Sequence, residues 1–264
     1  MSDGRKHMDV TGLLDTAAEA ARAAGPRLRK AFRTRPGVST KHDFHDPVTE
    51  HDRAAEESIR AVIDSRVPGS VIVGEEGGTT GSGELTWYVD PIDGTANFAA
   101  GLPFFCVSVA VAVRGELVAG VVYDPVREEE FTAGPDGARC NGAPLRSQGA
   151  ARDRQAVLLS SFPTPADVES RADAALHRYG RFLTSFAAVR KPGSAALMLA
   201  YVAAGWADAA YGTRSKPWDV AAGALLVSRA GGVYLGDPLA GGDYLAHVGG
   251  FDLRASALAE VAPH

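Results

Sequence analysis

The segment Trp87–Phe98, which reads W-Y-V-D-P-I-D-G-T-A-N-F, constrains this chain more than any other stretch. An apolar run with strand character enters a tight turn that contains Asp90, a proline and Asp93. Asp-Pro and Asp-Gly pairs are common in turns, so an ordinary turn is one interpretation. A cation site is the other, because Mg²⁺ prefers carboxylate and carbonyl oxygens. Under both interpretations a strand ends at this turn, and Gly94 allows the backbone to approach a ligand closely.

Three further acidic clusters stand at expected element boundaries. In D-P-V-T-E-H-D, Thr49 and Asp52 fit a capping signal before a helical pattern. Glu75 follows an apolar V-I-V run and therefore lies at a strand end, where α/β proteins tend to place ligand groups; a solvated loop carboxylate is the alternative. Asp219 follows a Lys-Pro pair in the first turn of a helical stretch, a place that the helix dipole alone would favour.

Taken jointly, these motifs resemble the inositol monophosphatase family, whose members are Mg²⁺-dependent, Li⁺-sensitive phosphatases that cleave small phosphomonoesters. The resemblance rests on D-P-V-T-E-H-D, G-E-E, D-P-I-D-G-T-A-N-F-A-A-G-L-P-F and W-D-V-A-A-G, in that order. It extends from about residue 13 to residue 230 and includes a G-A-R-C-N-G stretch. Four separated motifs in matching order are highly specific for the superfamily and much less specific for the substrate.

The resemblance implies a set of site residues, with hard oxygen donors throughout. It assigns these metal ligands: Glu75, Asp90, the Ile92 carbonyl, Asp93 and Asp219. It assigns these catalytic residues, which orient or activate the attacking water: Thr95, Asp52 and Glu75. It assigns these contacts to the substrate: Asp93, Gly94, Thr95, Gly193, Ser194 and Asp219. The implied cofactor is Mg²⁺, with two to three ions bound and Mn²⁺ able to substitute. Lys41 resembles a family lysine near the metals, with a solvated side chain as an equal alternative.

Composition agrees with this interpretation and excludes several classes of function. With 264 residues and 45% hydrophobic content, the chain can bury a large core. A net charge of −5 leaves no basic surface for nucleic acid or an anionic membrane. The sequence has neither a signal-peptide core nor an apolar stretch near the roughly 18 residues of a spanning helix, so we expect a cytoplasmic protein. His42, His45 and His51 match no tight zinc pattern, and we expect them at the surface.

Periodicity predicts the order of the elements. Helical patterns cover residues 8–32, 50–65, 165–179, 193–205 and 220–230, and strand patterns cover residues 107–113, 117–123, 128–132 and 157–161. The first three strands indicate an antiparallel meander. We place a boundary near residue 150, between residues 1–150, a helix plus antiparallel-sheet half with most metal ligands, and residues 151–264, an α/β half with Asp219 and substrate-side residues. The resemblance implies an α+β fold, a layered αβαβα sandwich.

Departures from the family pattern bear on the substrate. Inositol phosphatases carry a glutamate for substrate hydroxyls a few residues before W-D, and by count Gly212 takes that place here. Inositol 1-phosphate is therefore expected to be a substrate but not the best one. Relatives that act on histidinol phosphate often carry lysine after D-G-T, where this chain has Ala96. The prediction is a phosphoric monoester hydrolase acting on a small polyol or sugar phosphate, with a histidinol-phosphate or other amino-alcohol or sugar phosphate phosphatase as the alternative.

Two other classes stay open. A catalytically silent binding protein on the same fold would have lost part of the carboxylate set, whereas every carboxylate and Thr95 is present. A sugar-nucleotide enzyme on an open sheet would need a G-x-G-x-x-G turn, which G-E-E-G-G does not match. The predicted partner is a small phosphomonoester, without nucleic acid or membrane. A homodimer is expected because strands 107–123 and 157–161 carry more apolar surface than one sheet face needs.

Overall fold

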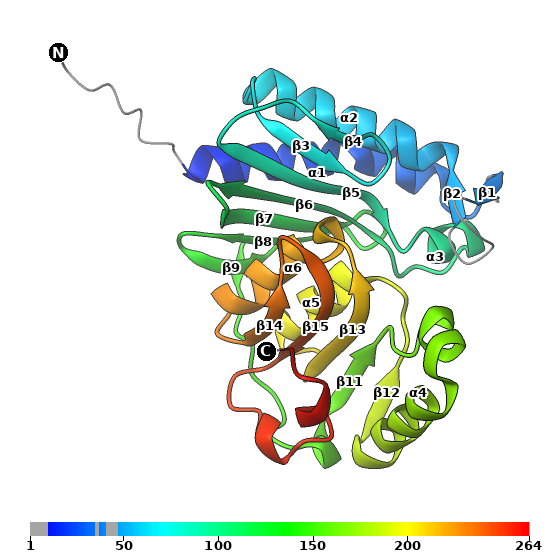
Figure 1. Ribbon diagram of the computed structural model, residues 1–264. Coiled ribbons are helices and arrows are strands. Elements are labelled where there is room, and N and C mark those ends of the chain that lie inside the picture. The colour runs from blue at the N-terminus through cyan, green and yellow to red at the C-terminus, as the bar shows by residue number, and fades with distance from the viewer. Residues whose placement is uncertain (1–9, 35–36, 41–46, 264) are drawn as a thin grey trace.

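The computed structural model describes residues 10–34, 37–40 and 47–263. Five layers alternate helix and sheet, as expected for an αβαβα sandwich (Figure 1). The helices are α1 (Val10–Ala31), α2 (Glu50–Arg66), α3 (Thr95–Ala100), α4 (Pro165–Ser185), α5 (Ala195–Ala204) and α6 (Pro217–Arg229). Short 3₁₀ turns cover Asp153–Gln155, Leu253–Ala255 and Ala259–Val261. Among the described residues no helix is both long and apolar enough to cross a membrane.

The larger sheet has eight strands in the order β10-β9-β8-β7-β6-β5-β3-β4. Its strands are β3 (Val71–Gly74), β4 (Gly78–Thr80), β5 (Leu85–Asp93), β6 (Cys106–Val113), β7 (Glu116–Asp124), β8 (Glu129–Gly134), β9 (Gly137–Cys140) and β10 (Ala143–Pro144). From β5 to β10 every neighbouring pair is antiparallel, so the predicted meander is confirmed, and β3 pairs with β5 in parallel. A separate two-stranded ribbon joins β1 (Val38–Thr40) to β2 (Pro47–Thr49).

The smaller sheet has five strands in the order β12-β11-β13-β15-β14. Its strands are β11 (Val157–Ser160), β12 (Ala188–Arg190), β13 (Ala209–Ser215), β14 (Val233–Asp237) and β15 (Gly241–His247). The pairs β11–β12 and β11–β13 are parallel, so the carboxyl ends of these three strands lie at one edge. Open sheets with parallel strands bind ligands at that edge.

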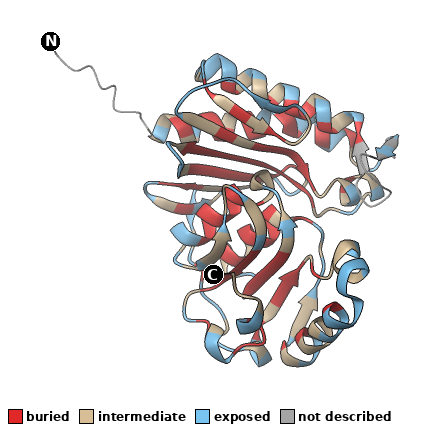
Figure 2. Cartoon of the chain, viewed as in Figure 1, coloured by how far each residue is buried: buried red, intermediate tan, exposed pale blue. Residues whose placement is uncertain are grey.

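Helices α5 and α6 lie between the two sheets, whereas α1 and α2 cover the outer face of the larger sheet and α4 lies on the outer side of the smaller one (Figure 1). The strands of the meander and the two central helices are almost wholly buried, and the outer face of α4 is exposed (Figure 2). Ala-rich α5 and α6 suit this position, because small side chains let helices approach two sheets at once.

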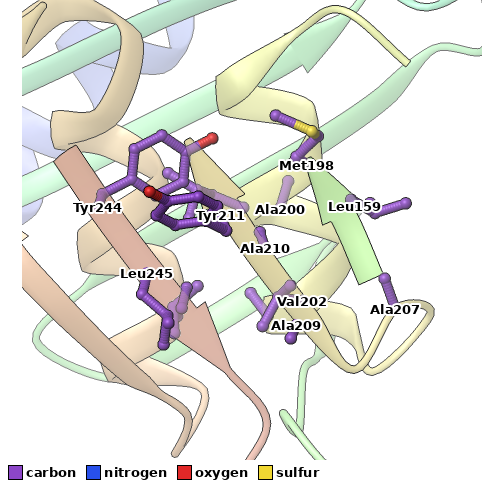
Figure 3. Packing of buried hydrophobic residues seen from close by; sticks show 14 of the residues in the cluster. Leu159, Met198, Ala200, Val202, Ala207, Ala209, Ala210, Tyr211, Tyr244 and Leu245 are labelled. Carbon is purple, nitrogen blue, oxygen red and sulfur yellow. The ribbon is translucent and has the colours of Figure 1, made fainter. Parts of the chain in front are cut away.

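Both sheets share one hydrophobic cluster. Phe131 of the larger sheet, Leu226 of α6 and Tyr211 of the smaller sheet belong to it, and Figure 3 shows the part around β11, β13, β15 and α5. The last strand of the larger sheet ends at Pro144 and the first strand of the smaller one begins at Val157. The division into two domains near residue 150 stays a prediction.

Candidate active site

The turn between β5 and α3 is built by its own side chains. Asp90 accepts a hydrogen bond from the Ile92 amide (2.9 Å), and the pairing of β5 with β6 shifts register between Asp90 and Asp93. A shift of this kind re-aims side chains at the end of a strand. Gly94 follows with φ 98°, and a Cβ there would come within 3.0 Å of the Phe104 carbonyl oxygen. Glycine is therefore needed for the strand to pass into α3.

Asp52 joins this turn to the start of α2. Its Oδ2 accepts hydrogen bonds from the amide and the hydroxyl of Thr49, both at 2.7 Å, which forms the predicted capping box. Its Oδ1 lies 3.0 Å from the Thr95 hydroxyl. Asp52 is fully buried. The capping interpretation is thus confirmed. The same carboxylate also contacts Thr95, in the turn between β5 and α3.

Thr95 has a second acceptor within reach. Its hydroxyl oxygen lies 2.9 Å from the Ile92 carbonyl oxygen. A hydroxyl carries one proton, so it donates to Asp52 or to Ile92 at any moment. If a cation were to bind the Ile92 carbonyl oxygen, the Thr95 hydroxyl would donate to Asp52. The lone pairs of Thr95 would then point away from Asp52.

Asp93 links β5 of the larger sheet to the start of α5. Its Oδ2 accepts hydrogen bonds from the Ser194 hydroxyl and from the Ala196 amide, both at 2.6 Å. Ser194 is the N-cap of α5 and also accepts from the Leu197 amide (3.3 Å). Gly193 and Ser194, predicted at the substrate side, therefore lie beside Asp93. Cys106, fully buried on β6, places its sulfur 3.9 Å from the same Asp93 oxygen.

Asp219 stands in the first turn of α6, two residues after Pro217 at the helix start. Its Oδ2 accepts a hydrogen bond from the Lys216 amide (2.7 Å), so its capping role is also present. Glu75 follows β3 at the adjoining strand end and is half-buried, and its amide donates to the Val89 carbonyl (3.2 Å) on β5.

Burial and mutual repulsion both act on these carboxyls. Burial raises the pKa of Asp93 to about 6, against the hydrogen bonds from Ser194 and Ala196, which lower it. Burial raises the pKa of Asp90 well above its ordinary range, and the charges of Glu75, Asp93 and Asp219 raise it further. The pKa of Asp219 is also raised, first by burial and then by Asp93. Glu75, Asp93 and Asp219 thus all act electrostatically on Asp90, and the four side chains form a single acidic cluster.

The donor set of this cluster fits a hard divalent cation. It offers carboxylate oxygens and one carbonyl oxygen. Among the described residues that mainly shift the pKa values of Asp90, Asp93 and Asp219, the one with a positive charge is Lys216. Across residues 10–34, 37–40 and 47–263, however, no three His, Cys, Asp or Glu side chains are arranged to hold an ion as they stand. Asp93 and Asp219 each accept a hydrogen bond from a protein donor at Oδ2.

Comparison with known proteins agrees with this site. The model of the inositol monophosphatase family matches residues 9–260. The chain belongs to the inositol monophosphatase family. Members of this family are generally metal-dependent. Two curated relatives are named Nus factor SuhB. The Pseudomonas aeruginosa protein is 43% identical over 227 residues and that of Escherichia coli K12 is 40% identical over 225, each match covering 84% of both chains.

Solved structures of the same family have the same fold. The extragenic suppressor protein suhB of Bartonella henselae superposes with a TM-score of 0.82 at 31% identity, covering 90% of this chain and 94% of that one. The Thermotoga maritima IMPase superposes with a TM-score of 0.80 at 33% identity, covering 90% and 92%. The layered fold predicted from the sequence is therefore confirmed.

At Gly212 the structure adds a constraint that the sequence did not show. A Cβ built there would come within 2.4 Å of Tyr244 Cε1 and 2.8 Å of the Ser161 hydroxyl oxygen. The place where the family glutamate would extend is therefore occupied by an aromatic ring from β15. Of the remaining predicted residues, Lys41, His42 and His45 lie outside the described residues, and His51 is half-buried against Phe98.

Proposed function

We propose that this protein is a Mg²⁺-dependent phosphomonoesterase that hydrolyses a small polyol or sugar phosphate with an activated water. One observation carries the proposal. Four carboxylates, two from β5, one from the end of β3 and one from α6, come together at a strand end beside a Thr95 hydroxyl paired with buried Asp52. Burial and the neighbouring charges raise the pKa of Asp90, so the cluster opposes folding unless a cation neutralises it.

The residues that would hold two to three Mg²⁺ ions, with Mn²⁺ substituting, are Glu75, Asp90, the Ile92 carbonyl, Asp93 and Asp219. When bound, such ions lower the pKa of water and neutralise the charge of phosphate oxygens. Glu75 and Asp90 come from neighbouring strands of the larger sheet, and Asp219 comes from α6. The set of ligands is therefore complete only when α6 packs against the larger sheet.

Thr95 and Asp52 would orient the attacking water, with Glu75 beside them. The two Thr49 donors occupy Asp52 Oδ2, which leaves Oδ1 to accept the Thr95 proton. With its proton so directed, the Thr95 oxygen presents lone pairs to a water and accepts a hydrogen bond from it. A water held in this way has a fixed direction of attack, which lowers the entropic part of the barrier.

The amides of Gly94 and Thr95 would hold the phosphate, and Gly193, Ser194, Asp93 and Asp219 would border the alcohol that leaves. Ser194 supports this arrangement because its hydroxyl and the start of α5 anchor Asp93. We further propose a cytoplasmic homodimer as the working form. The decisive experiment for the reaction is a panel of phosphomonoesters with Mg²⁺ present. Turnover of sugar, polyol or amino-alcohol phosphates supports the proposal, and the ranking within the panel separates polyol from histidinol phosphate.

The name Nus factor, which belongs to the curated relatives, favours a second candidate. On that candidate the chain would act as a binding protein on the phosphatase fold and would not need turnover. The intact Thr95–Asp52 pair supports catalysis, because a hydroxyl directed at a buried carboxylate has no role in binding a partner. Failure of the purified protein to hydrolyse any member of the panel would favour the binding role.

A further inference from the structure

The side chain of Tyr244, on β15, carries a buried hydroxyl group whose role the fold alone does not explain. The residue is 1% exposed, and its hydroxyl has no hydrogen-bond partner among the residues that the structure describes. A buried hydroxyl without a partner costs free energy, so each such group calls for an explanation. Tyr211 on β13 is equally buried, but its hydroxyl is not among the buried groups that lack a partner, and Arg178 lies beside it. The two side chains are drawn together in Figure 3.

The surroundings of the Tyr244 hydroxyl are acidic. After burial itself, the charges of Asp93, Tyr234 and Asp219 are what raise the pKa of this phenol. The hydroxyl thus lies within electrostatic range of two of the proposed cation ligands while bonding to neither. A phenol hydroxyl is a donor and a carboxylate oxygen is an acceptor, so the two kinds of group can pair.

The position of the ring is fixed by its neighbours. Tyr244 pairs across the sheet with Gly212, and a Cβ at Gly212 would lie 2.4 Å from the ring. On its other side the ring stacks on Tyr234, with centroids 6.1 Å apart and planes inclined by 9°. Glycine at position 212 is therefore what leaves room for the Tyr244 ring.

We propose that Tyr244 is a positioning residue for the cation site, whose hydroxyl donates a hydrogen bond to the Asp93–Asp219 carboxylate pair when that pair holds a divalent cation. This inference rests on the proposed function. The hydroxyl is closed off from solvent, so it acts on the carboxylates and not on the substrate. Carboxylates that ligate metals are themselves hydrogen-bonded, and loss of such a partner weakens metal binding by about 10- to 100-fold.

The test compares two identical chemical changes on neighbouring strands. Tyr244→Phe removes the unpartnered hydroxyl, and Tyr211→Phe removes one that lies near Arg178 on the α4 side of the sheet. Titration calorimetry with Mg²⁺ and with Mn²⁺, without any substrate, gives the affinity. Tyr244→Phe is expected to bind both ions at least about tenfold more weakly while its metal-free melting temperature stays the same or rises. Tyr211→Phe is expected to melt lower and to keep the wild-type affinity.

A third variant moves the phenol without deleting it. Gly212→Ala pushes the ring away from its place and is expected to weaken cation binding in the same direction. Wild-type affinity in Tyr244→Phe, with the wild-type protein binding Mg²⁺ normally, would overturn the role of Tyr244 and leave the proposed function standing. A wild-type protein that binds neither ion would overturn the proposed function and this inference with it.

Discussion

The Thr95 hydroxyl lies 3.0 Å from Asp52 Oδ1 although the two residues are 43 positions apart in the sequence. Asp52 is also the third residue of the capping box that begins α2. One buried carboxylate thus sets the start of a helix and the direction of a hydroxyl at the acidic turn. Any change to it tests both roles.

Replacing Thr95 separates the hydroxyl from the rest of the turn. Thr95→Ala should lower kcat by about 100-fold or more, because it removes an oriented group of the site. Thr95→Ser keeps the hydroxyl and should retain most of the activity. Steady-state kinetics on the best phosphomonoester measures both, and near wild-type turnover in Thr95→Ala would show that the hydroxyl has no catalytic role.

Asp52 has a matched control in the same chain. Asp167 completes an equivalent capping box with Thr164 at the start of α4, and it also accepts a hydrogen bond from Thr213 and pairs with Arg214. Asp52→Asn and Asp167→Asn should each cost about 0.5–2 kcal/mol of stability through the weakened cap. Only Asp52→Asn should also lower kcat by an order of magnitude or more. Equal kcat values in the two variants would confine Asp52 to capping.

The metal-free protein should become less stable as the pH rises through about 6. Burial raises the pKa of Asp93 from an ordinary 3.8 to about 6, so folding favours its protonated form. That contribution is fully present below the unfolded pKa and is lost as the pH passes the folded one; it is worth about 3 kcal/mol. The melting temperature in EDTA should therefore fall as the pH rises from about 4 to about 6.5, the window between the unfolded and the folded pKa.

Asp93→Asn identifies the group responsible. The variant keeps an oxygen acceptor for Ser194 and Ala196 but cannot ionise. In EDTA at pH 7.5 it should melt about 5 °C or more above the wild type, with a much smaller difference at about pH 4, near the unfolded pKa. A wild type and a variant that lose stability in parallel across this range would assign the pH dependence to other groups.

Local patterns predicted most of the fold, because the signals they carry are local. Helical spacing placed α1 and α2 within two residues of their observed bounds, and the meander strands were in the right order. The helix beginning at Pro165 was expected to end near residue 179 but continues to Ser185. Gly180 marks a helix stop at the expected end, but the helix continues through it, and Phe182 beyond it packs against Tyr211.

Contacts between distant segments were beyond the sequence. Ser194 donates a hydrogen bond to Asp93, 101 positions away in the sequence. The local sequence G-S-A does not indicate that its serine binds that carboxylate. Tyr244 was missed for the same reason, since its relation to Gly212 exists only through the pairing of β13 with β15. The constraint at Gly212 also rules out Gly212→Glu as a clean test of inositol specificity, because the new side chain would collide with the ring.

The expectation of a homodimer stays a prediction, but its original reason is wrong. The strands that carried the surplus apolar surface are buried inside the chain between helix layers. Exposed apolar side chains lie elsewhere, at Leu102 and Trp206 and, on α4, at Leu176 and Leu183. Light scattering at micromolar concentration should give twice 27.5 kDa. A mass near that of one chain would contradict the prediction.

Metal removal tests the central claim, that the acidic cluster serves cation-dependent hydrolysis, most directly. The purified protein is treated exhaustively with EDTA, and its turnover of the best phosphomonoester is then measured as Mg²⁺ is added back, beside Asp93→Asn. Activity should vanish on chelation and return with Mg²⁺ or Mn²⁺ in the wild type, while the variant stays at least about 100-fold lower at the same ion concentration. Full wild-type activity after chelation would contradict the account.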